Sequence, residues 1–254
     1  MYSSFHAQRF QQDRFSSDNE LLDVKQGDVN GDGIPDHVYL FGHKPDGPSG
    51  IFADRITLVI QDGYSQQRTI VPLQNNAGYN ASLFLGNFDN DTTSDILVSI
   101  DAGGSGGYGI FYIYSFAHNA VRMLFDSDTY NQDYKFNVQY ADYFKVIVSS
   151  PRLDVQFTID LSGKGYDYLS AYYSEDGKLK KPVQGEVLAL AALNPIVNTD
   201  NRKSFELLAL QRIIGDTNAD TLGYVENLLT WEGSKFISSR LSVAILGTTF
   251  RSPY

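Results

Sequence analysis

Short apolar or alternating runs of strand length recur along the first half of the chain, and clusters of turn-forming residues separate them. The clusters are Asp-Gly, Asn-Asn, Gly-Gly and Pro-Asp-Gly, which supply the positive-φ residues and pre-bent turns that hairpins require. This alternation predicts a series of β-hairpins. The predicted strands occupy residues 21–25, 37–41, 55–61, 69–73, 82–85, 96–100, 110–116 and 121–125.

The same pattern continues in the second half of the chain, where tyrosine is dense. Residues 204–214 fit a short helix about as well as a strand, because their apolar positions suit both periods. Further strands are predicted at residues 136–139, 144–148, 153–160 and 168–172.

The domain organisation follows from the polar segments. An Ala/Leu-rich run, an Asn-Pro pair and a polar stretch mark residues 185–203 as either a break between two subdomains or a long loop. The first twenty residues hold no apolar run like the core of a signal peptide, so the leader of an exported protein would lie outside this sequence. We expect a polar N-terminal extension at 1–20 and an all-β domain at 21–254 with at most minor helix.

Composition favours an acidic, globular β protein. The 254 residues include 22 Gly, 17 Tyr and 16 Phe against 2 Met and 1 Trp, which favours short strands and tight turns. The net charge of −10 disfavours nucleic acid and anionic membranes as partners and favours multivalent cations. The absence of cysteine excludes disulfides, zinc–thiolate sites and thiol catalysis. No apolar stretch approaches the length of a membrane span, so membrane insertion is not expected.

The strongest local signal is the sequence GDVNGDGIPD at residues 27–36. Its oxygen-bearing side chains fall at positions 1, 3, 5 and 9 of a loop, glycine at position 6 permits a sharp turn, and a carbonyl at position 7 completes a ring of ligands for a hard cation. An EF-hand is excluded because Tyr39 stands where that motif has its bidentate glutamate. A metal-free Asp/Asn/Gly turn is the alternative. The predicted calcium (Ca²⁺) ligands are Asp28, Asn30, Asp32, Asp36 and the carbonyl of Ile34.

A second copy of the loop, GNFDNDTTSD, occupies residues 86–95. It keeps the four ligand positions, but Thr92 replaces the glycine at position 6. The predicted metal ligands are Asn87, Asp89, Asp91 and Asp95.

A third, degenerate copy occupies residues 215–224 and offers Asp216, Asn218 and Asp220. Its ninth position is Tyr224, so an Asx-type turn between two strands explains it at least as well as a metal site. The first two loops begin 59 residues apart and the third begins 129 residues later, close to twice that spacing. This period predicts a repeat whose units resemble four-stranded propeller blades.

At these loops the chain resembles the FG-GAP/VCBS repeat family, which includes the calcium-loop blades of integrin α-subunit propellers and many bacterial surface proteins. The resemblance implies a β-propeller-like repeat of four-stranded blades, and it adds the carbonyl of Thr93 to the ligands of the second loop. No Phe-Gly…Gly-Ala-Pro stretch precedes the loops, and the length allows about four blades. An incomplete propeller and a two-part β protein therefore stay open. Members are typically adhesion or ligand-binding scaffolds, with some enzymes.

Other features suggest further sites, each with an ordinary structural alternative. The glycine-rich segment 101–109 lies between two predicted strands and lacks the lysine of a phosphate loop, which indicates a flexible hairpin loop. His37 and His43 would share one face of an unbroken strand and could share a metal, but ordinary packed histidines are the simpler interpretation. The tyrosines between residues 130 and 173 suit either an aromatic binding face or half-buried strands.

Together these features favour a non-catalytic module of the cell surface or exterior. Calcium would stabilise its loops, and other loops would bind a protein or carbohydrate partner in an adhesive or structural role. No catalytic motif is present, so no catalytic residue is assigned. The alternative is a carbohydrate-active enzyme, a polysaccharide lyase or hydrolase, that uses carboxylates and tyrosines on a propeller face.

Overall fold

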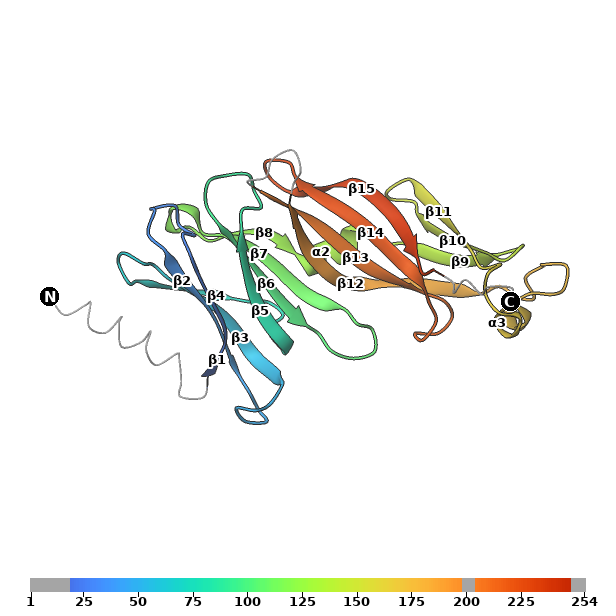
Figure 1. Cartoon of the computed structure of the whole chain (residues 1–254), viewed down its shortest axis with the longest axis horizontal. Helices are drawn as coiled ribbons and strands as arrows, with labels where there is room; N and C mark the ends of the chain where they lie inside the picture. The colour runs from blue at the N-terminus through green and yellow to red at the C-terminus, as the bar shows by residue number, and fades with distance from the viewer. Residues whose placement is uncertain (1–18, 198–203, 248–254) are drawn as a thin grey trace, which may run out of the picture. The chain divides into compact units, whose positions relative to one another are not determined.

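The computed structural model describes residues 19–197 and 204–247, and strands dominate this part of the chain (Figure 1). The prediction of a mostly β protein is confirmed. Backbone contacts divide the chain into two compact units. Unit 1 takes the described residues up to 103 together with 110–124, and unit 2 takes 104–109 and the described residues from 125 onward.

Unit 1 is built on an eight-stranded sheet with the order β1-β2-β3-β5-β6-β7-β8, in which β4 also pairs with β3. The pairs β1–β2, β2–β3 and β5–β6 are antiparallel. The strands are β1 (Asn19–Gly27), β2 (Asp36–His43), β3 (Phe52–Gln61), β4 (Arg68–Pro72), β5 (Gly78–Gly86), β6 (Asp95–Asp101), β7 (Gly109–Ser115) and β8 (Arg122–Asp126), with a short 3-10 turn η1 (Ala117–Asn119) before the last strand.

The core of unit 1 is built from alternate side chains along its strands. In β2 every second residue is buried, because successive side chains of a strand point to opposite faces of the sheet. The fully buried side chains that meet in this core include Val38, Leu40, Ile56, Leu58, Ile60, Ile96 and Val98.

Two hairpins of unit 1 have the same register around their loops. Gly27 at the end of β1 pairs with Asp36 at the start of β2, and Gly86 at the end of β5 pairs with Asp95 at the start of β6. The 59-residue spacing in the sequence therefore corresponds to a repeated hairpin. A repeat of four-stranded blades is not what the described residues show, because continuous ladders join the hairpins into one larger sheet.

Unit 2 contains a seven-stranded antiparallel sheet with the order β11-β10-β9-β12-β13-β14-β15. Its outermost strands, β11 and β15, contact each other, so the sheet curls almost into a barrel. The elements are α2 (Ser127–Asp133), β9 (Asn137–Ala141), β10 (Lys145–Ser150), β11 (Val155–Asp160), α3 (Tyr166–Tyr172), β12 (Gln184–Val197), β13 (Phe205–Ile214), β14 (Thr221–Trp231) and β15 (Phe236–Ile245).

Strand pairing in unit 2 decides the structure of the segments for which the sequence allowed two interpretations. Residues 205–214 are strand β13 rather than a helix, because β12 and β14 flank them on both sides. Residues 184–197 form the long strand β12 inside unit 2, and residues 198–203 lie outside the described residues. The chain passes from unit 1 to unit 2 after residue 124, apart from residues 104–109, which also belong to unit 2. Of the predicted N-terminal extension, residues 1–18 lie outside the described range, and Asn19 begins β1.

One strand prediction is wrong. Residues 168–172 belong to helix α3, in which Tyr168, Leu169 and Tyr172 pack against the core of unit 2. Their spacing of one and four residues places them on one face of a helix, and that contact overrides the strand propensity of tyrosine. Among the described residues no helix is long and apolar enough to cross a membrane.

Candidate functional site

The first predicted calcium loop connects β1 to β2 and is organised around the buried carboxylate of Asp36. One oxygen, Oδ2, accepts hydrogen bonds from the backbone N–H groups of Val29 at 3.0 Å and Asn30 at 3.2 Å. The other oxygen, Oδ1, accepts one from the N–H of Gly63 at 2.8 Å. Both oxygens of Asp36 are therefore satisfied by backbone groups.

The remaining side chains of the first loop also bind within the protein. The carboxylate of Asp28 accepts hydrogen bonds from the N–H groups of Gly31 and Gly33, and Asp32 accepts one from the N–H of Ile34. The side chain of Ile34 is partly exposed. These local bonds form Asx-type turns that order the loop.

Asn30 is buried at the third position of this loop, where it acts as a hydrogen-bond donor to three neighbouring oxygens. Its Nδ2 lies 3.0 Å from Asp62 Oδ2, 3.3 Å from Asp32 Oδ2 and 3.3 Å from Asn119 Oδ1. Its own Oδ1 accepts from the N–H of Asp32 at 3.0 Å. A neutral amide therefore occupies the middle of the first loop.

The second predicted loop connects β5 to β6 and repeats the bonding of its buried aspartate. Asp95 Oδ2 accepts hydrogen bonds from the N–H groups of Phe88 at 2.8 Å and Asp89 at 3.3 Å, as Asp36 Oδ2 does from Val29 and Asn30. The difference lies in the other oxygen. Within the described part of the chain, Asp95 Oδ1 and Asn87 Oδ1 are buried without a hydrogen-bond partner.

The electrostatics of the second loop are unfavourable for three ionised carboxylates. Burial is the largest cause that raises the pKa of Asp95, to about 7, and the charges of Asp89 and Asp91 add to it. Burial also raises the pKa of Asp89, although Arg122 Nη2 lies 2.5 Å from its Oδ2. The three carboxylates are therefore close enough to repel one another.

Two further contacts shape the second loop. The N–H and hydroxyl of Thr93 both donate to Asp91 Oδ1, at 2.6 and 2.8 Å, and the side-chain amide of Asn87 donates to the carbonyl of Asp91. The two loops also touch each other, because the N–H of Ser94 donates to the carbonyl of Asp28 at 3.2 Å.

Metal-ligand geometry is not already in place in either loop. In the described ranges, no three His, Asp or Glu side chains surround a common point as metal ligands do. The donor set of the second loop nevertheless fits a hard cation, because two of its buried oxygens have no donor among the described residues and three carboxylates lie close together. The residues that could hold the ion are Asn87, Asp89, Asp91, Asp95 and the carbonyl of Thr93.

The third predicted loop lies in unit 2, where tyrosines bind its carboxylates. Asp220 Oδ2 accepts from the hydroxyls of Tyr168 at 2.6 Å and Tyr140 at 3.2 Å, and Asp216 Oδ1 accepts from the hydroxyl of Tyr172 at 2.7 Å. Burial first, and then the neighbouring carboxylates, raise the pKa values of these phenols, that of Tyr172 to about 12. The phenols therefore stay protonated at neutral pH and act as donors.

Asn218, the middle residue of the third loop, accepts a hydrogen bond from an arginine. Arg212 Nη2 donates to Asn218 Oδ1 at 2.5 Å and to the carbonyl of Ser105 at 3.0 Å. The side-chain amide of Asn218 also donates to the Ser105 carbonyl, at 2.8 Å. Residues 104–109, the last part of the glycine-rich segment, belong to unit 2, and these bonds hold Ser105 there.

The two histidines that the sequence singled out have separate partners. His43 Nδ1 lies 2.9 Å from Asp54 Oδ1, a contact that lowers the pKa of Asp54. His37 instead stacks on the ring of Tyr39, with centroids 5.9 Å apart. Each histidine thus has an ordinary structural contact.

Sequence reasoning missed the groups that arrive from distant strands. Gly63 and Asp62 reach the first loop from the β3–β4 connection, and Arg122 reaches the second loop from the start of β8. No local pattern marks these residues, because each contact joins positions at least 27 apart in the chain.

Comparison with known proteins places the chain in a family. A family model named YybI C-terminal domain matches residues 134–244, within unit 2. The Bacillus subtilis (strain 168) protein YybI, described as uncharacterized, is 41% identical over 232 residues, which cover 91% of this chain and 87% of that protein. The chain belongs to the YybI family. No solved structure matches it.

Membership of the YybI family corrects the resemblance to FG-GAP/VCBS repeats, which is wrong. That resemblance depended on short Asp/Asn/Gly loops alone. Such loops suit many β-hairpins, since Asp, Asn and Gly favour turns for local reasons. The loop chemistry of this YybI-family chain must therefore be judged on its own contacts.

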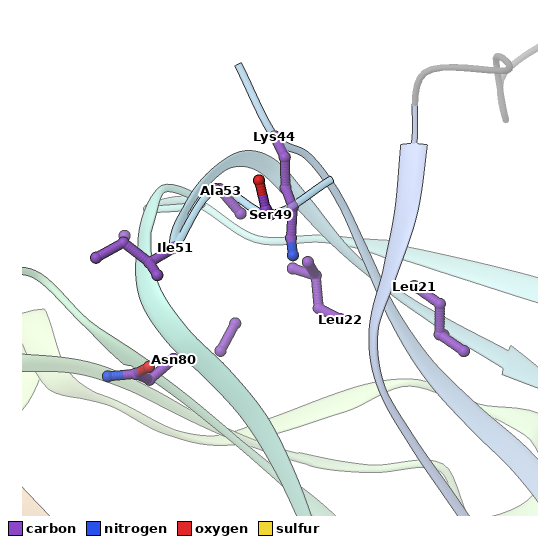
Figure 2. Close-up of a pocket in the computed structure, with 10 residues that line it drawn as sticks. Leu21, Leu22, Lys44, Ser49, Ile51, Ala53 and Asn80 are labelled. Carbon is purple, nitrogen blue, oxygen red and sulfur yellow. The ribbon is translucent and has the colours of Figure 1, made fainter. Parts of the chain in front are cut away.

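Unit 1 of this YybI-family chain also has a hollow of about 330 Å³ between β1, β5 and the β2–β3 connection (Figure 2). Lys44 borders it, and its Nζ donates to the carbonyl of Pro48 at 3.0 Å. The lining is mixed, with apolar side chains from both strands and polar atoms from the connection: Leu21, Leu22, Lys44, Ser49, Gly50, Ile51, Ala53, Gly78, Asn80 and Ala81.

Proposed function

We propose that this chain is a calcium-binding β protein with a structural or ligand-binding role and no catalytic activity. The observation that supports this proposal is in the second loop, where the buried atoms Asp95 Oδ1 and Asn87 Oδ1 lack donors from the described residues. Asp89 and Asp91 add charge beside them. A bound Ca²⁺ would satisfy the oxygens and cancel the repulsion in one step.

The chemistry of the donor set supports calcium over softer metals. Every candidate ligand is a carboxylate, amide or carbonyl oxygen, and the chain contains no cysteine. Hard cations with flexible coordination prefer such ligands, whereas thiolate and imidazole select transition metals. The spacing of Asn87, Asp89, Asp91 and Asp95 also brings alternate side chains of a loop to one side.

The first loop has the same spacing and we propose a weaker site there, at Asp28, Asn30, Asp32, Asp36 and the Ile34 carbonyl. Its carboxylates already accept backbone hydrogen bonds, so an ion gains less by binding to them. The second loop should therefore account for most of the effect of calcium on stability.

A cell-surface or extracellular location is part of the proposal. Calcium modules outside cells work with dissociation constants of about 10⁻⁴–10⁻³ M, because calcium is abundant there. A β-loop with one guanidinium already beside its ligands suits that weak range. The partner would be a protein or carbohydrate that binds away from the loops.

Thermal unfolding of the full chain tests the proposal. Millimolar calcium should raise the unfolding midpoint by several degrees relative to excess chelator, since a ligand that binds the native state stabilises it by mass action. Asp95→Asn keeps the shape of the side chain and should remove most of that gain. Asp36→Asn, at the equivalent place in the first loop, should remove less.

Equal midpoints in calcium and chelator for a metal-free preparation would show that both loops are plain turns. A larger loss for Asp36→Asn than for Asp95→Asn would move the main site to the first loop.

A further inference from the structure

Arg122 forms the closest charged contact of the second loop. It is the first residue of β8 and lies 33 positions after Asp89 in the chain, yet its Nη2 is 2.5 Å from Asp89 Oδ2. The arginine side chain is 53% exposed and the aspartate side chain is 4% exposed. The ion pair therefore joins a buried anion to a cation that sits largely in water.

In the first loop, a different group occupies the place that the Arg122 guanidinium has in the second loop. The third position of the first loop is Asn30 rather than an aspartate, and the Asn30 amide nitrogen donates to Asp32, Asp62 and Asn119. Both groups come from one part of the chain, since Asn119 lies in the connection from β7 to β8 and Arg122 is the first residue of β8. At its third position the first loop thus has a neutral amide that contacts an amide oxygen from this connection, and the second loop has a carboxylate that contacts a guanidinium.

We infer that Arg122 is a tethered competitor of the metal ion at the second loop. Its guanidinium neutralises Asp89 when no ion is bound and moves toward solvent when an ion takes its place. The inference rests on the proposed function, and it adds a residue that sets the affinity of that site.

The physical reason is repulsion between like charges. An ion ligated by Asp89 lies within a few ångströms of the place where Arg122 now sits, and two cations at that distance repel appreciably even near a protein surface. The arginine side chain is 53% exposed, so water can solvate it when it leaves, whereas the buried carboxylate needs a positive neighbour. The competition therefore weakens calcium binding without preventing it.

This arrangement predicts effects of opposite sign on stability and affinity. Arg122→Gln should lower the unfolding midpoint in chelator, because Asp89 loses its positive partner. The same variant should tighten calcium binding on the order of tenfold, because the repulsion disappears. A residue with a purely structural role would weaken both.

Calcium titration by calorimetry and thermal unfolding of the full chain, with and without chelator, test the inference. The control is Arg152→Gln, which makes the same change of charge at an exposed ion pair with Asp133 in unit 2. The inference requires tighter calcium binding in Arg122→Gln only. Unchanged or weaker binding in that variant would overturn it while leaving the proposed function standing.

A second measurement on the unmodified chain covers the case in which Arg122→Gln does not fold. The Nε–H resonance of Arg122, assigned by its loss in Arg122→Lys, should exchange faster with water on addition of calcium, while that of Arg152 stays constant. No change at Arg122 despite calcium binding overturns the inference. No calcium binding by the unmodified chain overturns the proposed function and the inference together.

Discussion

Asp36 and Asp95 occupy the same register in two hairpins of unit 1, but the protein satisfies their carboxylates differently. Each begins a strand opposite a glycine and accepts two backbone N–H groups on Oδ2. Gly63 donates to Oδ1 of Asp36, whereas Oδ1 of Asp95 has no donor among the described residues. Two similar sequences therefore give one aspartate with donors on both oxygens and one aspartate with a donor on a single oxygen.

The dependence of stability on pH should report the protonation of Asp95 in the second loop. The pKa of Asp95 is raised to about 7 from its ordinary value of 3.8, so over that interval the folded chain keeps a proton that the unfolded chain has lost. The free energy of unfolding in chelator should thus fall as the pH rises from about 4 to about 7 and then level off. We expect the unfolding midpoint to fall by about 3–8 °C more in the unmodified chain than in Asp95→Asn between pH 5 and pH 8.

Parallel midpoint curves for the two proteins would contradict this assignment. Saturating calcium provides a further check, because a bound ion favours the ionised carboxylate and should remove the decline.

The contact between the two loops predicts a cost for adding one methyl group. A Cβ on Gly31 would lie 2.7 Å from Thr93 Cγ2, and the backbone there has a φ of +86°. Gly33 has a similar φ of +83° but open space around a Cβ. Gly33→Ala should cost about 1 kcal/mol from backbone strain alone, and Gly31→Ala should cost about 2 kcal/mol or more.

Thr93→Ser removes the clashing methyl and keeps the hydroxyl that donates to Asp91. In urea unfolding it should rescue part of the loss in Gly31→Ala and none of the loss in Gly33→Ala. Equal rescue of both would mean that the loops do not meet at this point.

The tyrosine cluster of unit 2 should contribute to stability through its hydrogen bonds. Tyr168→Phe removes the 2.6 Å bond to Asp220 and leaves that carboxylate with Tyr140 as its phenol donor. We expect a loss of about 1.5–3 kcal/mol in urea unfolding, the usual contribution of a hydrogen bond to a charged group. Tyr166→Phe is the matched control because Tyr166 is 78% exposed on the same helix. Equal losses would show that the bond to Asp220 adds nothing.

Arg212 should determine how firmly the glycine-rich segment is held. Its guanidinium spans the carbonyls of Ser105 and Asn218 and the hydroxyl of Thr221, a set that a single ammonium cannot reach. Arg212→Lys should speed amide hydrogen exchange at residues 104–109 about tenfold, since local opening loses two or more hydrogen bonds. Arg240→Lys, on an exposed face of β15, should leave that exchange unchanged. If exchange at residues 104–109 stays slow in both variants, the backbone of the segment, and not Arg212, holds it in place.

Most strand positions followed from the sequence because alternation and turn residues act locally. The hairpin loops at residues 27–36 and 86–95 are where the Asp, Asn and Gly pattern predicts them. Helix α3 was missed, because tyrosine serves a strand or a helix face equally well until a neighbouring core selects one. The described residues do not show four-stranded blades, since repeated hairpins do not specify whether their sheets separate or join.

The sequence by itself determined the β class, the hairpin loops and the oxygen-rich positions within them, since these depend on neighbours within a few residues. Only the tertiary structure decided which of those oxygens are satisfied. Gly63 donates to the second oxygen of Asp36, and Arg122 approaches Asp89. Tyrosines donate to Asp216 and Asp220, whereas Oδ1 of the buried Asp95 has no donor among the described residues. A hydrogen bond is decided by distances of a few tenths of an ångström between groups far apart in the chain, and only folding sets those distances.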